Sequence, residues 1–470
     1  MAEINIQNTG EQDETSFRFM LKIGGPMVVA TISYTLMQFV DRLMVAHYSQ
    51  EALAAVLPAS IISFVPSSFL LGVMTTVNTF VSQSFGRRAY RDCAHYAWQS
   101  LYLGMVYSCI TFAILWPLAG RLFVLMDQPA EIVPLEVTYL RIMLIGQFVV
   151  VSIWSTNQFF MGIHQAKITM ITALVSQCVN VLANYVLIFG KWGFPEMGIA
   201  GAAWGTVIGA VVNAMTRVVW FLSPSIHKTF HSRTSFRFDV PKILDLVKIG
   251  APAGFALMVN TAFIGAILFS LIGRFGTAAQ AATSAVYSCM TLSFMPVVGI
   301  GIALTATVGK SIGRNRKDIA TKQTSLCLRL SMGYMGLVGL VFFLFRHAII
   351  SVWGLTPEAA ILGAKIMICA AIFQVFDAAV ITYNGALRGA GDTLWLGLVT
   401  TVGAFLVLGC GGWLIVVLMP QWNAIGPWVA YTLHVILVGV TNRWRFKSNH
   451  WHDIDLFKRQ STAVPVEESV

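Results

Sequence analysis

Two acidic residues lie inside long apolar segments of the chain, where a carboxylate is unexpected. Asp41 occurs within 20–46 and Asp377 within 358–386, whereas nearly all of the other acidic residues lie between such segments or near the chain ends. An acidic side chain at the centre of a membrane-spanning helix costs about 2.5–3.5 kcal/mol on insertion scales. Each of the two carboxylates is therefore a candidate for binding a cation or a proton.

Asp41 has polar neighbours on its own helix face and in two later segments. Tyr34 and Gln38 precede it by seven and three residues, which places all three on one face of a helix. The later segments contribute amides and a hydroxyl group: Asn180, Asn184 and Thr206. One carboxylate with several neutral oxygens suits a hard cation such as Na⁺, and a carboxyl group can instead carry a proton. The alternative is a hydrogen-bonded cluster that only holds helices together.

The second acid has a smaller polar set around it. Gln374 lies one helical turn before Asp377, and Asn260 is another amide in an apolar segment. Met290 and Phe294 are soft, apolar side chains that could contact an organic cation, although such residues more often only pack. The residues predicted to contact a substrate are Tyr34, Gln38, Asn260, Met290, Phe294 and Gln374.

The composition indicates the elements that must position these residues. Hydrophobic residues make up 56% of the 470 residues and charged residues only 11%, against about 25% charged residues in an ordinary globular domain. A helix crosses a bilayer with about 20 mostly apolar residues. The apolar runs predict an all-α integral membrane protein with twelve transmembrane helices, near 20–46, 51–80, 94–117, 136–162, 167–189, 198–222, 246–272, 279–307, 326–351, 358–386, 394–419 and 424–442.

The basic residues predict the orientation of these helices. Of the 31 Lys and Arg residues, 24 fall in or next to the two ends and the connections that share their side of the membrane, and 7 fall on the other side. Because Lys and Arg are enriched in cytoplasmic loops, we expect both termini in the cytoplasm of a bacterial cell, with the chain in its cytoplasmic (inner) membrane. The net charge of +10 is then explained by topology, and nucleic-acid binding is not needed.

The chain contains an internal repeat. The segment 23–26 (IGGP) recurs as 249–252 (IGAP), 81–87 (VSQSFGR) recurs as 308–314 (VGKSIGR), and 129–131 (PAE) recurs as 357–359 (PEA). Six helices per half, with both halves beginning on the same side, predict two pseudo-symmetric six-helix bundles. Two such bundles suit alternating access around a central cavity, as in secondary transporters. A channel formed by several subunits needs no such duplication.

This repeat divides the chain into predicted regions. They are an N-terminal tail (1–19), an N-lobe (20–222), a cytoplasmic linker (223–245), a C-lobe (246–443) and a C-terminal tail (444–470) that is polar and expected to be loose. No phosphate-binding loop, catalytic triad or metalloprotease motif is present, and the seven cysteines show no metal-binding spacing. We therefore expect a transporter rather than an enzyme, without a cofactor, driven by an ion gradient and acting as a monomer.

Several motifs resemble one known family, the multidrug and toxic compound extrusion (MATE) transporters, especially its NorM branch. The motifs are 38–41 (QFVD), 183–185 (ANY), 198–203 (GIAGAA), 373–377 (FQVFD) and 385–393 (GALRGAGDT), and the resemblance runs from about 20 to 443. It implies two six-helix lobes that export cationic drugs in exchange for Na⁺ or H⁺. Asp41, Asn180, Asn184 and Thr206 match the polar cluster of the family's N-lobe, and Asp377 matches its C-lobe carboxylate. A Na⁺-coupled protein would bind the metal at Asp41, Asn180 and Asn184.

The chain departs from the NorM pattern at two positions. Asn260 replaces a usual glutamate, and Phe373 replaces a tyrosine often found four residues before the C-lobe acid. Both changes weaken a C-lobe cation site, so we place the coupling ion at Asp41 and leave Na⁺ and H⁺ open. The expected partners are small drugs, organic cations and the lipid bilayer. The alternatives are a flippase or exporter of one lipid-linked or metabolite substrate, and a receptor or scaffold without transport.

Overall fold

The computed structural model describes residues 14–126, 131–266 and 271–457. Twelve helical segments within these ranges are long and apolar enough to cross a membrane, which confirms the predicted all-α fold class. The main helices are α1 (Phe17–Tyr48), α2 (Gln50–Gly86), α3 (Tyr90–Leu125), α4 (Val133–Gly162), α5 (Ala166–Phe189), α6 (Gly198–Phe221), α8 (Val240–Ala266), α9 (Thr277–Gly313), α10 (Lys317–Leu344), α12 (Pro357–Ala390), α13 (Thr393–Gly403), α14 (Gly412–Leu418) and α15 (Ile425–Lys447).

Short elements complete the chain. Two short helices are α7 (Pro224–Phe230) in the linker and α11 (Arg346–Ser351) before α12. The π-helix η3 (Ala404–Gly411) joins α13 to α14, so that the three form a single membrane span, Thr393–Leu418. Short 3₁₀ turns are η2 (Gly273–Phe275), η4 (Pro420–Trp422) and η5 (His450–Asp453). Glycines with positive φ end α5 at Gly190 and α12 at Gly391, where a side chain would be strained.

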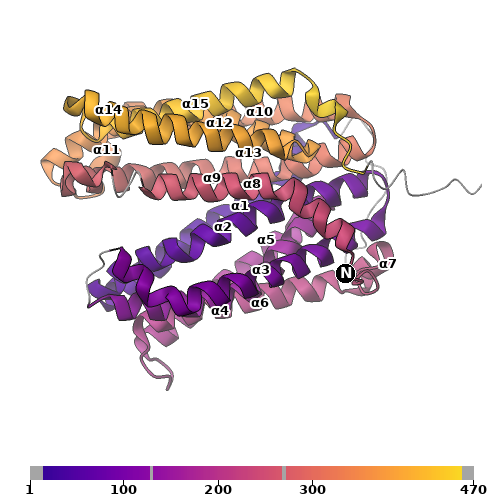
Figure 1. Ribbon diagram of the computed structural model, residues 1–470, viewed down its shortest axis with the longest axis horizontal. Helices are drawn as coiled ribbons and strands as arrows, with labels where there is room; N and C mark the ends of the chain where they lie inside the picture. The colour runs from indigo at the N-terminus through magenta and orange to yellow at the C-terminus, as the bar shows by residue number, and fades with distance from the viewer. Residues whose placement is uncertain (1–13, 127–130, 267–270, 458–470) are drawn as a thin grey trace, which may run out of the picture.

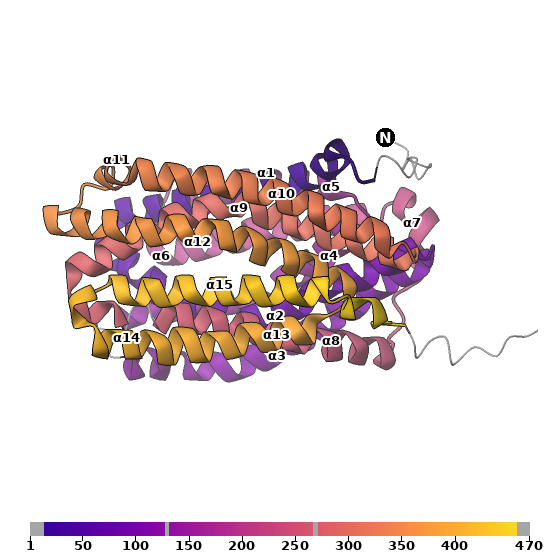
Figure 2. The same ribbon diagram turned by 90° about the horizontal axis from the view of Figure 1, so that it is seen from above.

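The helices form two lobes (Figure 1). Helices α1–α6 make the N-lobe, and α8–α15 make the C-lobe that lies above it in Figure 1. Seen from the C-lobe side, the long helices run roughly along the length of the molecule (Figure 2). Each lobe has its own large apolar core: Phe80, Tyr96 and Phe159 belong to one in the N-lobe, and Met290, Phe373 and Trp428 belong to that of the C-lobe.

Each lobe receives the first turns of the other lobe's first helix. Met20 at the start of α1 packs in a C-lobe core with Leu304 and Val308, and it is 3% exposed. Leu246 near the start of α8 packs in the N-lobe core with Phe80 and is fully buried. Met20 and Leu246 are 226 residues apart, which is the offset of the sequence repeat. The exchange is therefore pseudo-symmetric and ties the lobes together at one end.

The hydrogen bonds between the lobes gather at this end, called here the joined end. It contains the α2–α3 and α9–α10 turns. Thr79 donates to the carbonyl oxygen of Arg388 at 2.8 Å, and Gln83 donates to that of Gly389 at 2.9 Å. Thr31 donates to the carbonyl oxygen of Met295 at 3.2 Å. Asp41 lies ten residues beyond Thr31 on α1, which is about 15 Å along the helix, in the half away from the joined end.

A neutral histidine adds to the joined end. His164, in the turn between α4 and α5, lies 3.3 Å through Nε2 from the carbonyl oxygen of Ala306. Burial, together with the nearby Lys310 ammonium, lowers the pKa of His164 to about 3. The ring is therefore uncharged at neutral pH and donates its Nε2 proton across the lobes without adding a charge beside Lys310.

The described residues just before α1 and those after α15 each contact the lobe to which their helix does not belong. Glu14, which precedes α1, is 3% exposed and accepts from Lys310 Nζ at 2.9 Å and from Arg314 at 3.0 Å. At the other terminus, Asp455 pairs with Arg87 at 3.2 Å, and Phe457 packs in the N-lobe core. The predicted loose tail is thus docked as far as residue 457, because apolar side chains anchor this otherwise polar segment.

The Glu14 contacts predict an effect on stability. Glu14→Gln removes the carboxylate partner of Lys310, whose side chain is 10% exposed, and leaves a nearly buried cation without its counter-charge. We expect a loss of about 3 kcal/mol, the low end for a buried pair that loses one partner. Asp455→Asn is the matched control, because its partner Arg87 is 39% exposed and an exposed pair contributes about 1 kcal/mol at most. Thermal unfolding in detergent measures both, and equal shifts would contradict the prediction.

Candidate cation site in the N-lobe

Asp41 and Asn184 form the centre of the candidate site. The side-chain nitrogen of Asn184 on α5 donates to Asp41 Oδ1 on α1 at 2.7 Å. Asn184 is fully buried and Asp41 is partly buried. A short hydrogen bond to an ionised acceptor is stronger than one between neutral groups. The pair therefore stabilises a carboxylate, and no hydrogen bond to its second oxygen is found among the described residues.

Glycines on α6 allow α5 to approach closely enough for this arrangement. A Cβ atom at Gly205 would overlap the side-chain oxygen of Asn184, and one at Gly209 would lie 2.8 Å from Asn180 Cβ. Gly201 meets the backbone of Leu187 in the same way. Small residues four apart let two membrane helices pack backbone to backbone. This stripe fixes the position of Asn184 and encloses its side-chain oxygen, which is buried and has no hydrogen-bond partner in the described residues.

The other two predicted N-lobe ligands, Asn180 and Thr206, make weaker or no hydrogen bonds to Asp41 and Asn184. Asn180, 2% exposed, accepts from Asn184 through its side-chain oxygen at a long 3.5 Å. The hydroxyl group of Thr206 donates to the carbonyl oxygen of Ala202 on its own helix at 3.0 Å. The structure thus joins Asp41, Asn184 and Asn180 by hydrogen bonds, whereas the bond found for Thr206 is local to α6. Their roles in cation binding stay predictions.

Two further side chains near Asp41, Tyr139 and Arg42, were not identified from the sequence as part of the site. Tyr139 on α4 interacts electrostatically with Asp41 and with Tyr34, and its hydroxyl group bonds with Ser60. Arg42 interacts with Tyr34 and Tyr139 and, across the lobes, with Tyr287 on α9. A single tyrosine in an apolar helix resembles any packing residue. Only the placement of α4 against α1 reveals its part in the site.

In the C-lobe, no hydrogen bond among the described residues joins Asp377 to the polar residues predicted to accompany it. Gln374 donates to Ser293 on α9. Tyr431 on α15 interacts electrostatically with Asp377 and stacks on Phe373 with ring centroids 5.0 Å apart. A tyrosine from another helix thus lies near the carboxylate where the NorM pattern places one four residues earlier.

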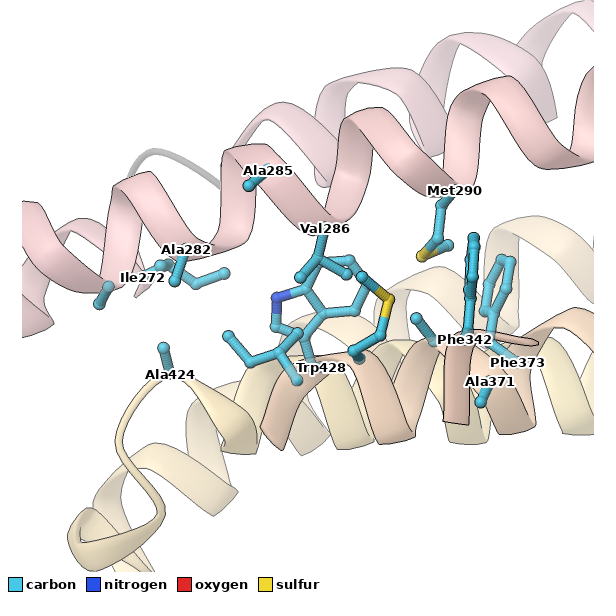
Figure 3. Packing of buried hydrophobic residues seen from close by; sticks show 14 of the residues in the cluster. Ile272, Ala282, Ala285, Val286, Met290, Phe342, Ala371, Phe373, Ala424 and Trp428 are labelled. Atoms are coloured by element: carbon cyan, nitrogen blue, oxygen red, sulfur yellow. The ribbon is translucent and has the colours of Figure 1, made fainter. Parts of the chain in front are cut away.

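The residues predicted to contact a substrate differ in accessibility. Tyr34 is 52% exposed, and Gln38 and Asn260 are partly exposed. Met290 is 1% exposed and Gln374 is fully buried. Figure 3 shows Met290 packed among Phe342, Phe373 and Trp428 in the C-lobe core, and Phe294 is partly buried in a neighbouring cluster. Met290 and Gln374 are therefore enclosed in this conformation, whereas Tyr34, Gln38, Asn260 and Phe294 are at least partly accessible.

The donor set available for a metal ion is mostly neutral. Among the residues that the structure describes, no three His, Cys, Asp or Glu side chains form a cluster that could hold a metal ion. A cation at Asp41 would have one carboxylate and the amide oxygen of Asn180 nearby, and it would gain the oxygen of Asn184 only if that amide turned over. Such a set suits a monovalent ion or a proton better than a tightly held divalent metal.

Comparison with known proteins identifies the family. The family model MatE matches residues 26–186 and 252–411. The chain belongs to the MatE family. The two matches begin 226 residues apart, the same offset that relates Ile23 to Ile249 and Met20 to Leu246. The family unit therefore occurs once in each lobe, and the resemblance inferred from the sequence motifs is confirmed.

Individual relatives and solved structures agree with this assignment. The chain is 27% identical over 433 residues to a probable multidrug resistance protein NorM of Bacillus cereus, covering 89% of this chain and 93% of the relative. A probable multidrug resistance protein NorM of Xylella fastidiosa is 27% identical over 430 residues, with 90% of each chain covered. The fold of this chain is similar to that of an outward-facing multidrug resistance MATE family transporter, with a TM-score of 0.84 and 17% identity over 94% of this chain and 99% of the other. It is also similar to the eukaryotic MATE transporter AtDTX14, with a TM-score of 0.83 and 17% identity over 94% of this chain and 97% of the other.

Proposed function

We propose that this MatE protein is a secondary transporter that exports cationic or amphipathic organic compounds in exchange for Na⁺ or H⁺. The bond between Asp41 and the buried Asn184 is the observation that carries the proposal. The names of the NorM relatives support multidrug export. The distribution of Lys and Arg supports a bacterial cytoplasmic membrane with both termini inside, so that the joined end faces the cytoplasm.

A single carboxylate can couple two cations because it cannot neutralise both at once. Asp41 lies in the half of α1 away from the joined end and is only partly buried, and Tyr34 on the same face is exposed. A cation or proton that binds Asp41 removes the negative charge that a cationic substrate needs. Binding of the cation or proton at Asp41 thus favours the state that has released substrate. Asp377 is a second carboxylate at which an ion or proton can bind. It shifts that equilibrium only by its different affinity for the two states.

The orientation of the Asn184 amide favours a proton over Na⁺. Its nitrogen faces Asp41 and its oxygen faces Gly205. A protonated Asp41 still accepts the Asn184 hydrogen bond through its carbonyl oxygen, so protonation requires no rearrangement. A Na⁺ ion bridging Asp41 and Asn184 needs the amide to turn its oxygen towards the carboxylate.

Transport of a fluorescent cationic dye in proteoliposomes tests this function. Na⁺ and pH gradients are imposed separately, and dye movement is followed in each case. We expect a pH gradient alone to drive dye transport at a rate well above that of liposomes without protein. Transport driven by Na⁺ alone would still support antiport. It would show that the oxygen of the Asn184 amide, and not its nitrogen, faces Asp41 when the ion is bound.

Absence of dye movement under both gradients would overturn multidrug export. The second candidate, a flippase or exporter of one lipid-linked or metabolite substrate, would then be tested with a labelled phospholipid or pyrophosphate-linked lipid in the same vesicles. Such a substrate needs cationic groups along its path, and Arg42 is the basic residue that lies near both Asp41 and the C-lobe residue Tyr287.

A further inference from the structure

A polar pocket lies at the joined end, outside the candidate cation site. It has a volume of about 260 Å³ and is formed by the first turns of α3 and the linker that follows α7. Its lining residues are Arg91, Asp92, His95, Thr234, Ser235 and Arg237. Nothing in the proposed transport cycle uses these side chains, so the pocket requires its own explanation.

Two guanidinium groups dominate the chemistry of the pocket. Arg91 and Arg237 are exposed, and neither has a hydrogen-bond or ion-pair partner for its side chain among the described residues. The carboxylate of Asp92 is already neutralised, because Lys242 Nζ lies 2.6 Å from it. The free charge of the pocket is therefore positive. Planar guanidinium groups bind phosphate oxygens in pairs of parallel hydrogen bonds.

The linker beside the pocket is held against α3 by aromatic and amide side chains. Trp98 donates to the carbonyl oxygen of Ser232 at 2.8 Å, and Tyr102 donates to that of Phe236 at 2.6 Å. Gln99 donates to the carbonyl oxygen of Arg237 at 2.7 Å. Trp and Tyr are enriched where membrane helices pass the lipid headgroups. The two aromatic residues therefore indicate that the linker lies at headgroup depth.

Apolar side chains of the linker point outward at the same level. Phe236 is 55% exposed and Phe238 is 66% exposed, on either side of Arg237. Exposed phenyl groups next to an arginine are typical of a segment that lies in the membrane interface, with rings among acyl chains and the cation among headgroups. A ligand of this pocket therefore has a phosphate group and apolar chains beside it.

We propose that the pocket between α3 and the linker binds the phosphate group of an anionic phospholipid in the leaflet at the joined end. Arg91 and Arg237 hold the phosphate oxygens, and Phe236 and Phe238 contact the acyl chains. A zwitterionic lipid binds more weakly, because its choline group is repelled by the two arginines. The linker joins the two lobes, so the bound lipid also fastens it to the membrane.

Native mass spectrometry of the purified full-length protein in detergent tests the proposal without any transport assay, so its result is independent of the proposed function. Phosphatidylglycerol and phosphatidylcholine with the same acyl chains are titrated separately, and inorganic phosphate is added as a competitor. We expect Arg91→Gln and Arg237→Gln each to weaken phosphatidylglycerol binding at least about tenfold, since each removes charge-assisted hydrogen bonds. Lys228→Gln on α7 is the control, because it removes an exposed charge outside the pocket.

A variant of opposite sign completes the design. Asp92→Asn removes the one carboxylate of the pocket and should strengthen phosphatidylglycerol binding. Size-exclusion profiles show which variants fold, and Asp92→Asn remains informative if an arginine variant does not. Equal binding by all variants, or equal binding of the two lipids, would overturn the proposal. Displacement of the lipid by millimolar inorganic phosphate would assign the site to free phosphate instead.

Discussion

Asp41→Asn should abolish gradient-driven dye transport while the protein remains folded in the membrane. The substitution keeps the size of the side chain. It also keeps an oxygen that can accept the hydrogen bond from Asn184, which is 2.7 Å long in the unmodified protein. It removes the charge for which ion and substrate compete. We expect the rate in proteoliposomes to fall to that of liposomes without protein. Stability should be unchanged or slightly higher, because a partly buried charge no longer has to be desolvated.

Two further variants separate loss of charge from general damage. Asn184→Ala keeps the carboxylate but removes its hydrogen-bond donor, so transport should persist with an ion dependence shifted about tenfold or more. Asp318→Asn removes an acidic group that pairs with Arg316 at the surface, where its side chain is 54% exposed, and should transport normally. Full transport by Asp41→Asn under either gradient would refute the role assigned to Asp41.

Gly205→Ala should damage both stability and transport, although it adds only one methyl group. The new Cβ would overlap the side-chain oxygen of Asn184 and lie 2.9 Å from the backbone nitrogen of the same residue. The backbone of α5 cannot yield as a flexible side chain would, so α5 and α6 must separate or Asn184 must turn away from Asp41. Overpacking of this kind costs about 1–3 kcal/mol. Transport falls because the packing of α5 against α6 is disturbed, which goes beyond the loss of one hydrogen bond to Asp41 in Asn184→Ala.

Gly120→Ala is the matched control for this prediction. Gly120 lies in α3 of the same lobe, and a Cβ there would meet nothing within 4 Å. Alanine also favours a helix over glycine by about 1 kcal/mol, so this variant should be as stable as the original protein or more so, with normal transport. Thermal unfolding in detergent and dye flux measure both variants. Equal behaviour of Gly205→Ala and Gly120→Ala would show that the α5–α6 contact is not tight.

The membrane architecture could be predicted from local features of the sequence. Apolar runs of about 20 residues have one low-energy solution in a bilayer, a helix that satisfies its own backbone hydrogen bonds. The count of twelve spans follows from those runs and is confirmed. The internal repeat, with its offset between Ile23 and Ile249, could also be found from the sequence alone. The two matches to the MatE family model begin at the same separation.

Part of the candidate site could also be predicted from the sequence. A carboxylate such as Asp41 is costly in an apolar helix, and amides four residues apart, such as Asn180 and Asn184, must share a helix face. These rules concern single helices. They identify polar residues but do not show which of them contact each other. Only the packing of α5, α6 and α1 distinguishes Asn184, which contacts Asp41, from Thr206, whose hydrogen bond is local.

The tertiary structure decided the remaining features, because they depend on contacts between helices far apart in the chain. Gly205 matters only because Asn184 of α5 lies against it, and Tyr139 and Tyr431 become neighbours of the two acids only when α4 and α15 are in place. Composition and periodicity determine how each segment meets lipid or protein. Which partner it meets is set by the packing of all helices together, since small residues and polar groups find their complements only there.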